Sequence, residues 1–301
     1  MPIIGTTGME VSRLVLGTMT FGRPVPRRDA IEMVHWALDH GINFFDTADM
    51  YEGYDRTPGS AGGVAETILG DAVSDRRERA VLMTKVGCAI GSADYSGEGL
   101  SGAHIFHQID ASLQRLRTDH VDFYLLHRPD PRTPLAESLA AMARLIEQGK
   151  VRQWGFSNFD APQIREMVAL CDANGWPRPV ISQPRYNWLN RDVEAEHLPT
   201  CAEFGIAVAP YQPLQGGLLT GKYRRDSPAP TDSRAADSPW LELPDGKLYD
   251  RLEQFQAEAL RAGVPQATYA LSWLLAHPQV AAVVVGSKRV DQLEPFLTLL
   301  D

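Results

Sequence analysis

Short apolar segments rich in β-branched residues alternate with longer segments of helical periodicity almost to the end of the chain. In residues 135–146, apolar side chains lie on one helix face, at Leu135, Leu139, Met142 and Ile146. Such strand–helix repetition predicts parallel strands, because each helix returns the chain to the same edge of the sheet. Eight strands are predicted, at residues 14–16, 43–45, 81–84, 121–126, 151–156, 180–183, 206–209 and 281–285.

A doubly wound sheet and a closed barrel both accommodate eight parallel strands. The strands are short and polar residues follow them directly, which favours a (β/α)8 TIM barrel, an α/β fold with its reactive groups at the carboxyl ends of the strands. We expect one domain over residues 1–301, since no Gly/Ser-rich linker divides the chain. Residues 224–240, rich in Pro and Ser, are predicted to form a long functional loop.

Two helix starts are visible in the sequence. Thr133 is predicted to be an N-cap, with Pro134 as the first helical residue. Asp160 is predicted to cap a helix that begins at Ala161.

Charge and cysteine usage exclude several classes of protein. The net charge is −9, which argues against nucleic acid or an anionic membrane as the main partner. The cysteines, Cys88, Cys171 and Cys201, are widely spaced and form no CxxC pair, a pattern typical of packing thiols in a reducing compartment. The N-terminus does not resemble a secretion signal, and no apolar segment reaches the roughly 18 residues that span a bilayer. We therefore expect a soluble cytoplasmic protein without a metal site.

In the stretch FFDTADMYEGY, residues 44–54, a segment predicted to be buried is followed directly by charged residues. Asp46 and Asp49 follow two aromatic residues, and Tyr51 comes next. Since a buried carboxylate requires a cationic partner, Lys85 and His127 are candidates, because each ends another predicted strand. The strand ends of a barrel meet at one mouth, so these side chains could lie together. Taken singly, the lysine could be a solvated rim residue and the histidine a core residue.

Six segments of the chain, in order, resemble the successive motifs of the aldo-keto reductase family: GINFFDTADMYEGY, LMTKVG, DFYLLHRPD, GKVRQWGFSNF, PYQPLQGGLLTGKY and VVVGSKRVDQL. The resemblance covers nearly the whole chain. It implies a (β/α)8 barrel preceded by a short N-terminal β-hairpin, for which residues 3–14 are the candidate. It also implies reduction of a carbonyl group by hydride transfer.

The resemblance assigns catalytic roles to four residues. Tyr51 is the general acid that protonates the carbonyl oxygen, and Lys85 is expected to lower its pKa from the usual value of about 10. Asp46 pairs with the Lys85 ammonium and positions it. His127 donates a hydrogen bond to the substrate oxygen and orients it.

Hydride transfer requires a carrier, and no G-x-G-x-x-G motif indicates a Rossmann site. The G-x-x-x-x-G-K pattern in residues 216–222 is not a phosphate loop of a nucleotide triphosphatase, because Tyr223 stands where Ser or Thr would ligate magnesium. The resemblance instead implies that NADP(H) binds across the barrel mouth and that Tyr211 stacks on its nicotinamide ring. The predicted cofactor-binding residues are Gly17, Thr18, Met19, Asp46, Ser157, Asn158, Gln183, Tyr211, Gln212, Pro213, Leu214, Gln215, Gly217, Lys222, Arg234, Gly286, Lys288 and Gln292.

The segment around Lys288 is expected to run from a strand into a helix whose N-terminus and lysine bind a 2′-phosphate, which favours NADPH over NADH. The chain departs from the family here. Pro295 and Phe296 stand where relatives carry an acidic residue and Asn facing adenine. Lys288 stands where Arg is frequent and cannot form a bidentate clamp.

The substrate is predicted to be a small carbonyl compound bound in an open pocket. Residues 52–63 are longer than the usual turn after the family's tyrosine, and the chain stops soon after its last predicted helix. Aromatic aldehydes, bulky ketones and sugar-like carbonyls fit an open mouth lined by Met19, Phe21, Tyr51, Tyr54, His127 and Arg128, with the 224–240 loop beside it. Two alternatives stay open: a Schiff-base lyase that uses Lys85, and a catalytically weak redox-sensing or regulatory subunit.

Overall fold

A computed structural model describes residue 4 and residues 7–57, 59–91, 96–237, 241 and 245–300. Eight parallel strands form its main sheet, in the order β10-β1-β2-β3-β6-β7-β8-β9. They are β1 (Leu14–Gly17), β2 (Phe44–Asp46), β3 (Val81–Val86), β6 (Val121–Leu126), β7 (Val151–Ser157), β8 (Ile181–Gln183), β9 (Ala207–Val208) and β10 (Val283–Gly286). The eight predicted strands are confirmed, with ends that differ by up to two residues.

Backbone hydrogen bonds between the two outermost strands close the sheet. The Val208 amide donates to the Gln279 carbonyl at 3.1 Å, and the Ala281 amide donates to the Val208 carbonyl at 2.9 Å. Further toward the carboxyl ends of the same two strands, the Val284 amide donates to the Pro210 carbonyl at 2.9 Å. The sheet is therefore a (β/α)8 barrel, the fold class that the strand–helix repetition predicts.

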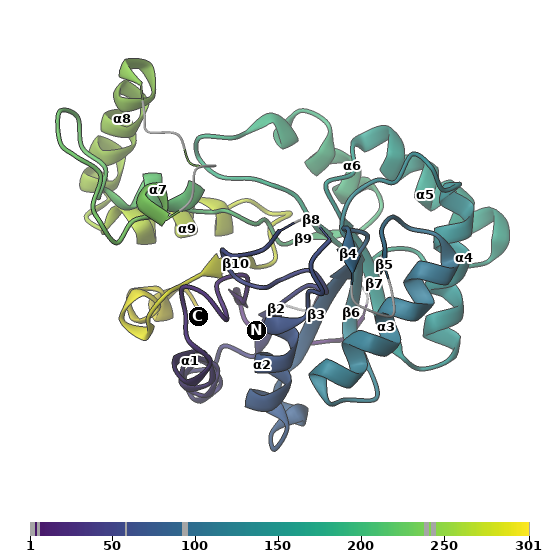
Figure 1. The fold of residues 1–301 in the computed structure, drawn as a ribbon. Helices are drawn as coiled ribbons and strands as arrows, with labels where there is room; N and C mark the ends of the chain where they lie inside the picture. The colour runs from purple at the N-terminus through teal and green to yellow at the C-terminus, as the bar shows by residue number, and fades with distance from the viewer. Residues whose placement is uncertain are drawn as a thin grey trace.

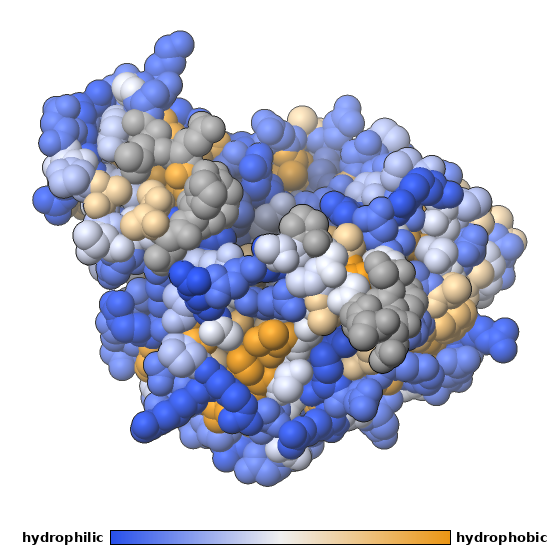
Figure 2. Space-filling model, viewed as in Figure 1, coloured by the Kyte–Doolittle hydropathy of each residue, from blue (hydrophilic) through white to orange (hydrophobic). Residues whose placement is uncertain are grey.

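Helices surround the strands, and α7, α8 and α9 gather beside β10 (Figure 1). The face of the molecule seen in Figure 2 is mainly hydrophilic. The described α-helices are α1 (Arg27–Asp39), α2 (Val64–Val73), α3 (Gly102–Leu116), α4 (Leu135–Glu147), α5 (Ala161–Asn174), α6 (His197–Glu203), α7 (Arg234–Asp237), α8 (Gly246–Ala262) and α9 (Gln266–Leu275). The 3-10 helices are η1 (Arg77–Arg79), η2 (Asp192–Glu194), η3 (Gln215–Thr220), η4 (Val290–Gln292) and η5 (Glu294–Leu299).

Several local expectations need correction. An antiparallel pair, β4 (Ile90–Gly91) with β5 (Ser96–Gly97), follows β3 and was not predicted. The 224–240 segment is not all loop, since it contains α7, and its residues 238–240 lie outside the described residues. The chain after β10 forms the 3-10 helices η4 and η5 rather than an α-helix.

The predicted helix starts and hairpin have mixed outcomes. Asp160 caps α5, as predicted, and the cap is a full capping box with Gln163. Thr133 does not cap α4, because its hydroxyl donates to Asp130 Oδ2 at 2.8 Å and the helix begins at Leu135. Residues 3, 5 and 6 of the predicted N-terminal hairpin lie outside the described residues, and in the rest of it the Ile4 amide donates to the Met9 carbonyl at 3.2 Å.

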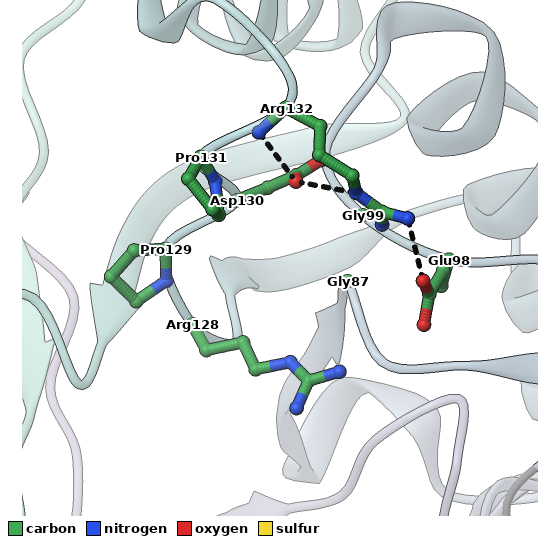
Figure 3. A pocket seen from close by; sticks show the side chains of 8 residues that line it. All are labelled: Gly87, Glu98, Gly99, Arg128, Pro129, Asp130, Pro131 and Arg132. Atoms are coloured by element: carbon green, nitrogen blue, oxygen red, sulfur yellow. Dashed lines mark hydrogen bonds and ion pairs between the residues drawn. The ribbon is translucent and has the colours of Figure 1, made fainter.

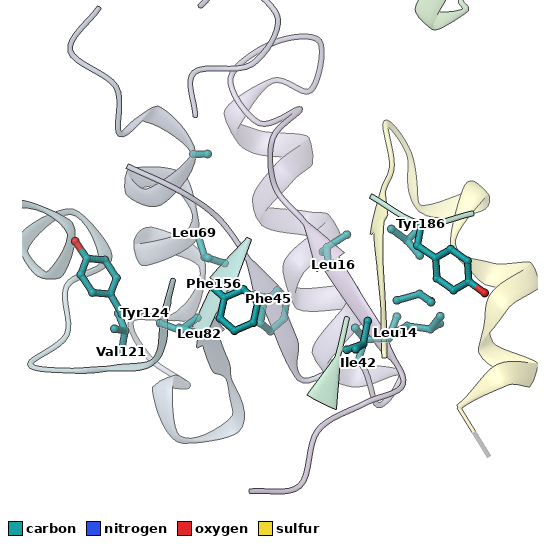
Figure 4. Packing of buried hydrophobic residues seen from close by; sticks show 14 of the residues in the cluster. Leu14, Leu16, Ile42, Phe45, Leu69, Leu82, Val121, Tyr124, Phe156 and Tyr186 are labelled. Atoms are coloured by element: carbon teal, nitrogen blue, oxygen red, sulfur yellow. The ribbon is translucent and has the colours of Figure 1, made fainter. Parts of the chain in front are cut away.

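Side chains alternate along each strand between two apolar layers. Leu14, Leu16, Phe45 and Leu82 belong to the outer layer, which packs against the helices (Figure 4). The inner layer fills the barrel and contains Val15, Phe44, Met83, Phe123, Leu125, Ile181, Ala209 and Val284. A strand buried on both faces is apolar at every position, which is why these strands appear in the sequence as continuous apolar segments.

Candidate active site

The alternation along the strands decides which side chains reach the inside of the barrel mouth. Successive side chains of an extended chain point to opposite faces, so the residue two positions after an inward-pointing one points inward as well. Two positions after Phe44, Met83, Leu125, Ile181 and Ala209 of the inner layer stand Asp46, Lys85, His127, Gln183 and Tyr211. Polar groups from five strands and their continuations therefore converge at the carboxyl end of the barrel.

Lys85 is the centre of this group and is fully buried. Its Nζ lies 2.7 Å from Asp46 Oδ1 and donates to the Thr47 carbonyl at 2.7 Å. It also donates to the Tyr51 hydroxyl at 3.3 Å. Gln183 Nε2 donates to the same Asp46 oxygen at 2.8 Å. All three ammonium donors thus have partners, which is what makes burial of the charge tolerable.

Tyr51 and His127 lie side by side next to the ammonium. The Tyr51 ring is 4.9 Å from Lys85 Nζ, measured from the ring centroid, and meets the His127 ring edge-on with 6.0 Å between centroids. The Tyr51 backbone is held by the Ala65 amide, which donates to its carbonyl at 3.0 Å. The four predicted catalytic residues therefore form one contiguous group.

The pKa of Tyr51 corrects one expectation. Burial raises the pKa of the phenol well above its usual value, and the negative charge of Asp46 raises it further. The expected lowering of this pKa is not found, because burial outweighs the nearby Lys85 ammonium and Asp46, 2.7 Å from that ammonium, partly offsets its charge. The phenol is consequently protonated at neutral pH, the state that a general acid requires.

His127 is a neutral imidazole. Burial lowers its pKa well below the usual value, and the cations Lys85, Arg128 and Arg56 lower it further. Its Nδ1 lies 3.6 Å from Cys88 Sγ, and no hydrogen bond of its Nε2 is found among the described residues. A neutral ring can donate through one nitrogen and accept through the other.

Residues predicted to hold a nicotinamide lie together on the opposite side of the mouth. The Tyr211 hydroxyl donates to Asn158 Oδ1 at 2.9 Å, and Asn158 Nδ2 donates to the Ser157 hydroxyl oxygen at 3.0 Å. The Ser157 hydroxyl donates in turn to the Gln183 carbonyl at 2.6 Å. Since Gln183 gives its Nε2 to Asp46, its side-chain oxygen stays available as an acceptor.

Backbone strain is concentrated at this mouth. Asn158, Gln212 and Gln215 have φ values of 63°, 57° and 46°, in the left-handed region that non-glycine residues rarely adopt. Gln212 and Gln215 are held in place by Asn187, a buried residue that the sequence did not indicate. Its Nδ2 donates to the Gln212 carbonyl and to Gln215 Oε1. Such strain is typical of ligand-binding and catalytic segments.

The remaining predicted cofactor residues form two groups. Gly17 pairs with Asp46 and Gly286 at the strand ends, and Thr18 donates to the Asp46 carbonyl. Pro213, Leu214, Gly217 and exposed Lys222 continue along η3 from the Gln212 segment.

The segment around Lys288 differs from the predicted helix N-terminus. Gln292 Oε1 accepts from the Lys288 amide at 2.9 Å, and Lys288 Nζ donates to the Asp232 carbonyl at 3.0 Å. Tyr54 lies here too, with the Arg234 guanidinium 3.7 Å from its ring centroid and Lys288 Nζ 5.8 Å from it. The anion-binding N-terminus of a helix is absent from this described segment, since η4 is a three-residue 3-10 helix.

The predicted substrate-pocket residues differ in their burial and in their contacts. Phe21 has no exposed surface and packs in the outer apolar layer, so its prediction as a pocket residue is wrong. Met19 is 37% exposed, and Tyr54 contacts the predicted phosphate-binding side chains. Arg128 is exposed beside His127.

Three residues near the centre escaped the sequence-based prediction. Cys88 contacts His127, and the positive charge of Arg56, from the 52–63 segment, helps to lower the pKa of His127. Asp49 is fully buried, and burial together with the negative charge of Glu66 raises its pKa. For Asp49 the signal was its place in FFDTADMYEGY, whereas neither Cys88 nor Arg56 stands at a strand end.

No group of three or more His, Cys, Asp or Glu side chains within the described ranges is arranged to hold a metal ion. None of the helices described has both the length and the apolar character to cross a bilayer.

The chain was compared with known proteins. The family model described as "Aldo/keto reductase family" matches residues 13–301. A probable voltage-gated potassium channel subunit beta of Arabidopsis thaliana is 34% identical over 99% of this chain and 90% of its own length. The uncharacterized oxidoreductase YrpG of Bacillus subtilis (strain 168) is also 34% identical, with the same coverage. Aflatoxin B1 aldehyde reductase member 2 of Rattus norvegicus is 33% identical over 94% of this chain and 78% of its own. A barrel mouth with buried Asp46 and Lys85 in contact with Tyr51 and a family match along almost the whole sequence agree, and the chain belongs to the aldo-keto reductase family.

Proposed function

We propose that this protein reduces aldehydes or ketones to alcohols, with NADPH as the hydride donor and Tyr51 as the general acid. The observation that carries the proposal is the contiguous group of Asp46, Lys85, Tyr51 and His127 at the barrel mouth. Membership of the aldo-keto reductase family supports carbonyl reduction as the general chemistry. Relatives named as an oxidoreductase and as an aldehyde reductase support it as well.

The residues on the other side of the mouth fit a nicotinamide cofactor. Gln183 offers a free side-chain oxygen to a carboxamide N–H, and Asn158 and Ser157 lie next to it. Gln212 Oε1 is buried without a hydrogen-bond partner in the described ranges, an arrangement that a bound donor would satisfy. Gly216 and Gly217 have φ values of 64° and 96°, and Lys222 lies against Gly217, where its positive charge could meet phosphate oxygens.

A bound NADPH would supply the hydride to the carbonyl carbon. His127, neutral and with Nε2 unengaged, donates a hydrogen bond to the carbonyl oxygen and orients it. The oxygen takes the phenolic proton of Tyr51 as it gains negative charge. Lys85 then stabilises the phenolate that remains, because the ammonium lies 3.3 Å from the Tyr51 oxygen. A high phenol pKa does not prevent this transfer, since an alkoxide is a stronger base than a phenolate.

The Schiff-base alternative is disfavoured by the surroundings of Lys85. An amine must offer a free lone pair to attack a carbonyl. Lys85 Nζ is fully buried and donates to three oxygen atoms, one of them on a carboxylate. Borohydride is therefore expected to trap no carbonyl compound on Lys85.

A regulatory subunit is the second candidate, because the Arabidopsis relative bears the name of a potassium channel subunit beta. The two candidates share the fold and differ in turnover. NADPH binding without measurable oxidation by any of a broad panel of aldehydes and ketones would favour the regulatory role.

The deciding experiment follows NADPH absorbance with the purified protein and that panel. In Tyr51→Phe we expect kcat to fall by about 10²–10⁴-fold, the usual contribution of a general acid, while the Kd for NADPH changes by less than about twofold. The matched control is Tyr249→Phe on α8, which removes a hydroxyl from a half-buried helix residue and should leave both constants intact. Retained turnover in Tyr51→Phe would contradict the proposed role of this residue.

A further inference from the structure

The backbone of His127 is held by two neighbouring segments. Its amide donates to the Val86 carbonyl at 2.8 Å, and its carbonyl accepts from Asn158 Nδ2 at 3.0 Å. These bonds fix where the side chain leaves the backbone, but they do not determine which ring nitrogen carries the proton of the neutral imidazole. The proposed reaction requires that proton on Nε2, because this nitrogen donates to the carbonyl oxygen of the substrate.

A turn at Gly87 brings Cys88 to the ring. Lys85 points into the barrel, so strict alternation would place Cys88, three residues later, on the outward face of the strand. Gly87 has a φ of 125°, which ends the extended conformation, and a Cβ at this position would lie 2.8 Å from Leu100 Cδ2. The chain therefore turns after Gly87, and Cys88 Sγ lies 3.6 Å from His127 Nδ1.

The chemistry of the two groups decides which of them donates. Cys88 is only 8% exposed, and burial raises the pKa of its thiol, so the sulfur carries a proton at neutral pH. Either the thiol donates to Nδ1, or an Nδ1–H donates to the sulfur. The first arrangement is favoured because an imidazole nitrogen is a stronger acceptor than a thiol sulfur. It leaves the single proton of the ring on Nε2.

A pocket lined by Gly87 and Arg128 adjoins this contact, and its two carboxylates are engaged elsewhere (Figure 3). Glu98 lies 2.6 Å from Arg132 Nη1, and Asp130 lies 3.2 Å from Arg132 Nε. A carboxylate beside the imidazole would accept a proton from Nδ1 and so favour the opposite tautomer. Because both acids pair with the arginine, the weaker thiol is left to determine the tautomer.

We propose that Cys88 is a positioning residue for carbonyl reduction, whose thiol donates to His127 Nδ1 and thereby keeps the ring proton on Nε2, facing the substrate oxygen. The inference rests on the proposed function and adds a residue to it. Without the thiol, the ring can also adopt the tautomer with its proton on Nδ1. In that form Nε2 presents a lone pair to the carbonyl oxygen and cannot orient it.

The first measurement needs neither cofactor nor substrate. In protein prepared with ¹⁵N-labelled histidine, the two-bond couplings between ring nitrogens and ring protons distinguish the two tautomers, and loss of a signal in His127→Gln assigns it. We expect the Nε2–H tautomer in the wild type at pH 7 and a mixture of both in Cys88→Ala. Cys88→Ser, which matches Cys88→Ala in size but keeps a hydroxyl donor, should retain the wild-type tautomer.

The second measurement is kinetic. Cys88→Ala should lower kcat/KM for a reducible aldehyde by about 2- to 10-fold, the range that one neutral hydrogen bond accounts for, with the Kd for NADPH unchanged. Cys88→Ser should restore most of the loss. The matched control is Cys171→Ala, which removes a buried thiol from α5 and should change neither the tautomer nor kcat/KM.

Three results would overturn the inference: a wild-type ring with its proton on Nδ1, an unchanged tautomer in Cys88→Ala, or identical behaviour of Cys88→Ser and Cys88→Ala. The last would mean that the thiol only fills space. A protein that reduces no carbonyl compound would instead refute the proposed function, and the NMR measurement would still report the tautomer of His127.

Discussion

Asp49, two residues before Tyr51, is fully buried, and neither of its carboxylate oxygens has a hydrogen-bond partner in the described part of the chain. Burial raises its pKa well above the usual value, and the negative charge of Glu66 raises it further. A carboxyl group so close to the proposed general acid is tolerated because it is uncharged. As an anion, it would further disfavour the phenolate form of Tyr51.

Replacing this acid gives a prediction for stability. A group with a raised pKa in the folded state stabilises the fold at low pH, and that contribution is lost as the pH rises through the folded-state pKa. Asp49→Asn removes the ionisable group, so its free energy of unfolding relative to wild type should increase from pH 4 to pH 8. Each unit of pKa shift corresponds to about 1.4 kcal/mol. Urea denaturation at several pH values measures the difference.

The control for Asp49→Asn neutralises an exposed acid. Glu147→Gln, at the end of α4, should give a difference from wild type that varies little over the same pH range. A constant difference for Asp49→Asn as well would show that Asp49 is not held neutral by burial.

At the scale of elements, the pairing of β7 with β8 positions the residues that we propose to bind the nicotinamide. Gly155 pairs with Ile181 and Ser157 pairs with Gln183 in the parallel register. A Cβ on Gly155 would lie 2.1 Å from the Ile181 carbonyl oxygen, so the two strands approach too closely for any other residue. The glycine thereby sets the separation at which the Ser157 hydroxyl reaches the Gln183 carbonyl.

Gly155→Ala is therefore expected to destabilise the protein by about 1–3 kcal/mol or more, because the strands must separate. It should also weaken NADPH binding, since Ser157 and Gln183 move with the strands. Urea denaturation and a fluorescence titration with NADPH measure the two effects. Gly246→Ala at the start of α8, where the added Cβ meets no atom within 4 Å, serves as the control and should affect neither.

For the molecule as a whole, buried histidines couple stability to pH. Burial lowers the pKa values of His104, His127 and His197 below the usual value of 6.5. The unfolded chain then binds more protons than the folded one below about pH 6.5, so folding stability falls as the pH drops. Each pH unit costs up to about 1.4 kcal/mol for a histidine that stays neutral.

We expect the free energy of unfolding to decrease steadily between pH 7 and pH 5. The measurement is best made in Asp49→Asn, because the raised pKa of Asp49 acts in the opposite direction. His104→Gln and His197→Gln should each reduce the slope, whereas exposed His40→Gln should not. A stability that is independent of pH in this range would contradict the assignment of neutral buried histidines.

The sequence by itself determined the parallel barrel and which polar residues meet at its mouth. Strand–helix repetition predicts the barrel, and a two-residue alternation carries Asp46, Lys85 and His127 to the inside of one rim. These properties depend on local periodicity, which a chain displays before it folds. The N-cap at Asp160 was predictable for the same reason.

Only the tertiary structure decided how these groups behave. The phenol pKa of Tyr51 rises because residues distant in sequence bury it. The Cys88 thiol contacts His127 across two strand ends, and Phe21 is fully buried in the outer layer. Desolvation and contact depend on how closely non-neighbouring segments pack, and no local pattern specifies that distance.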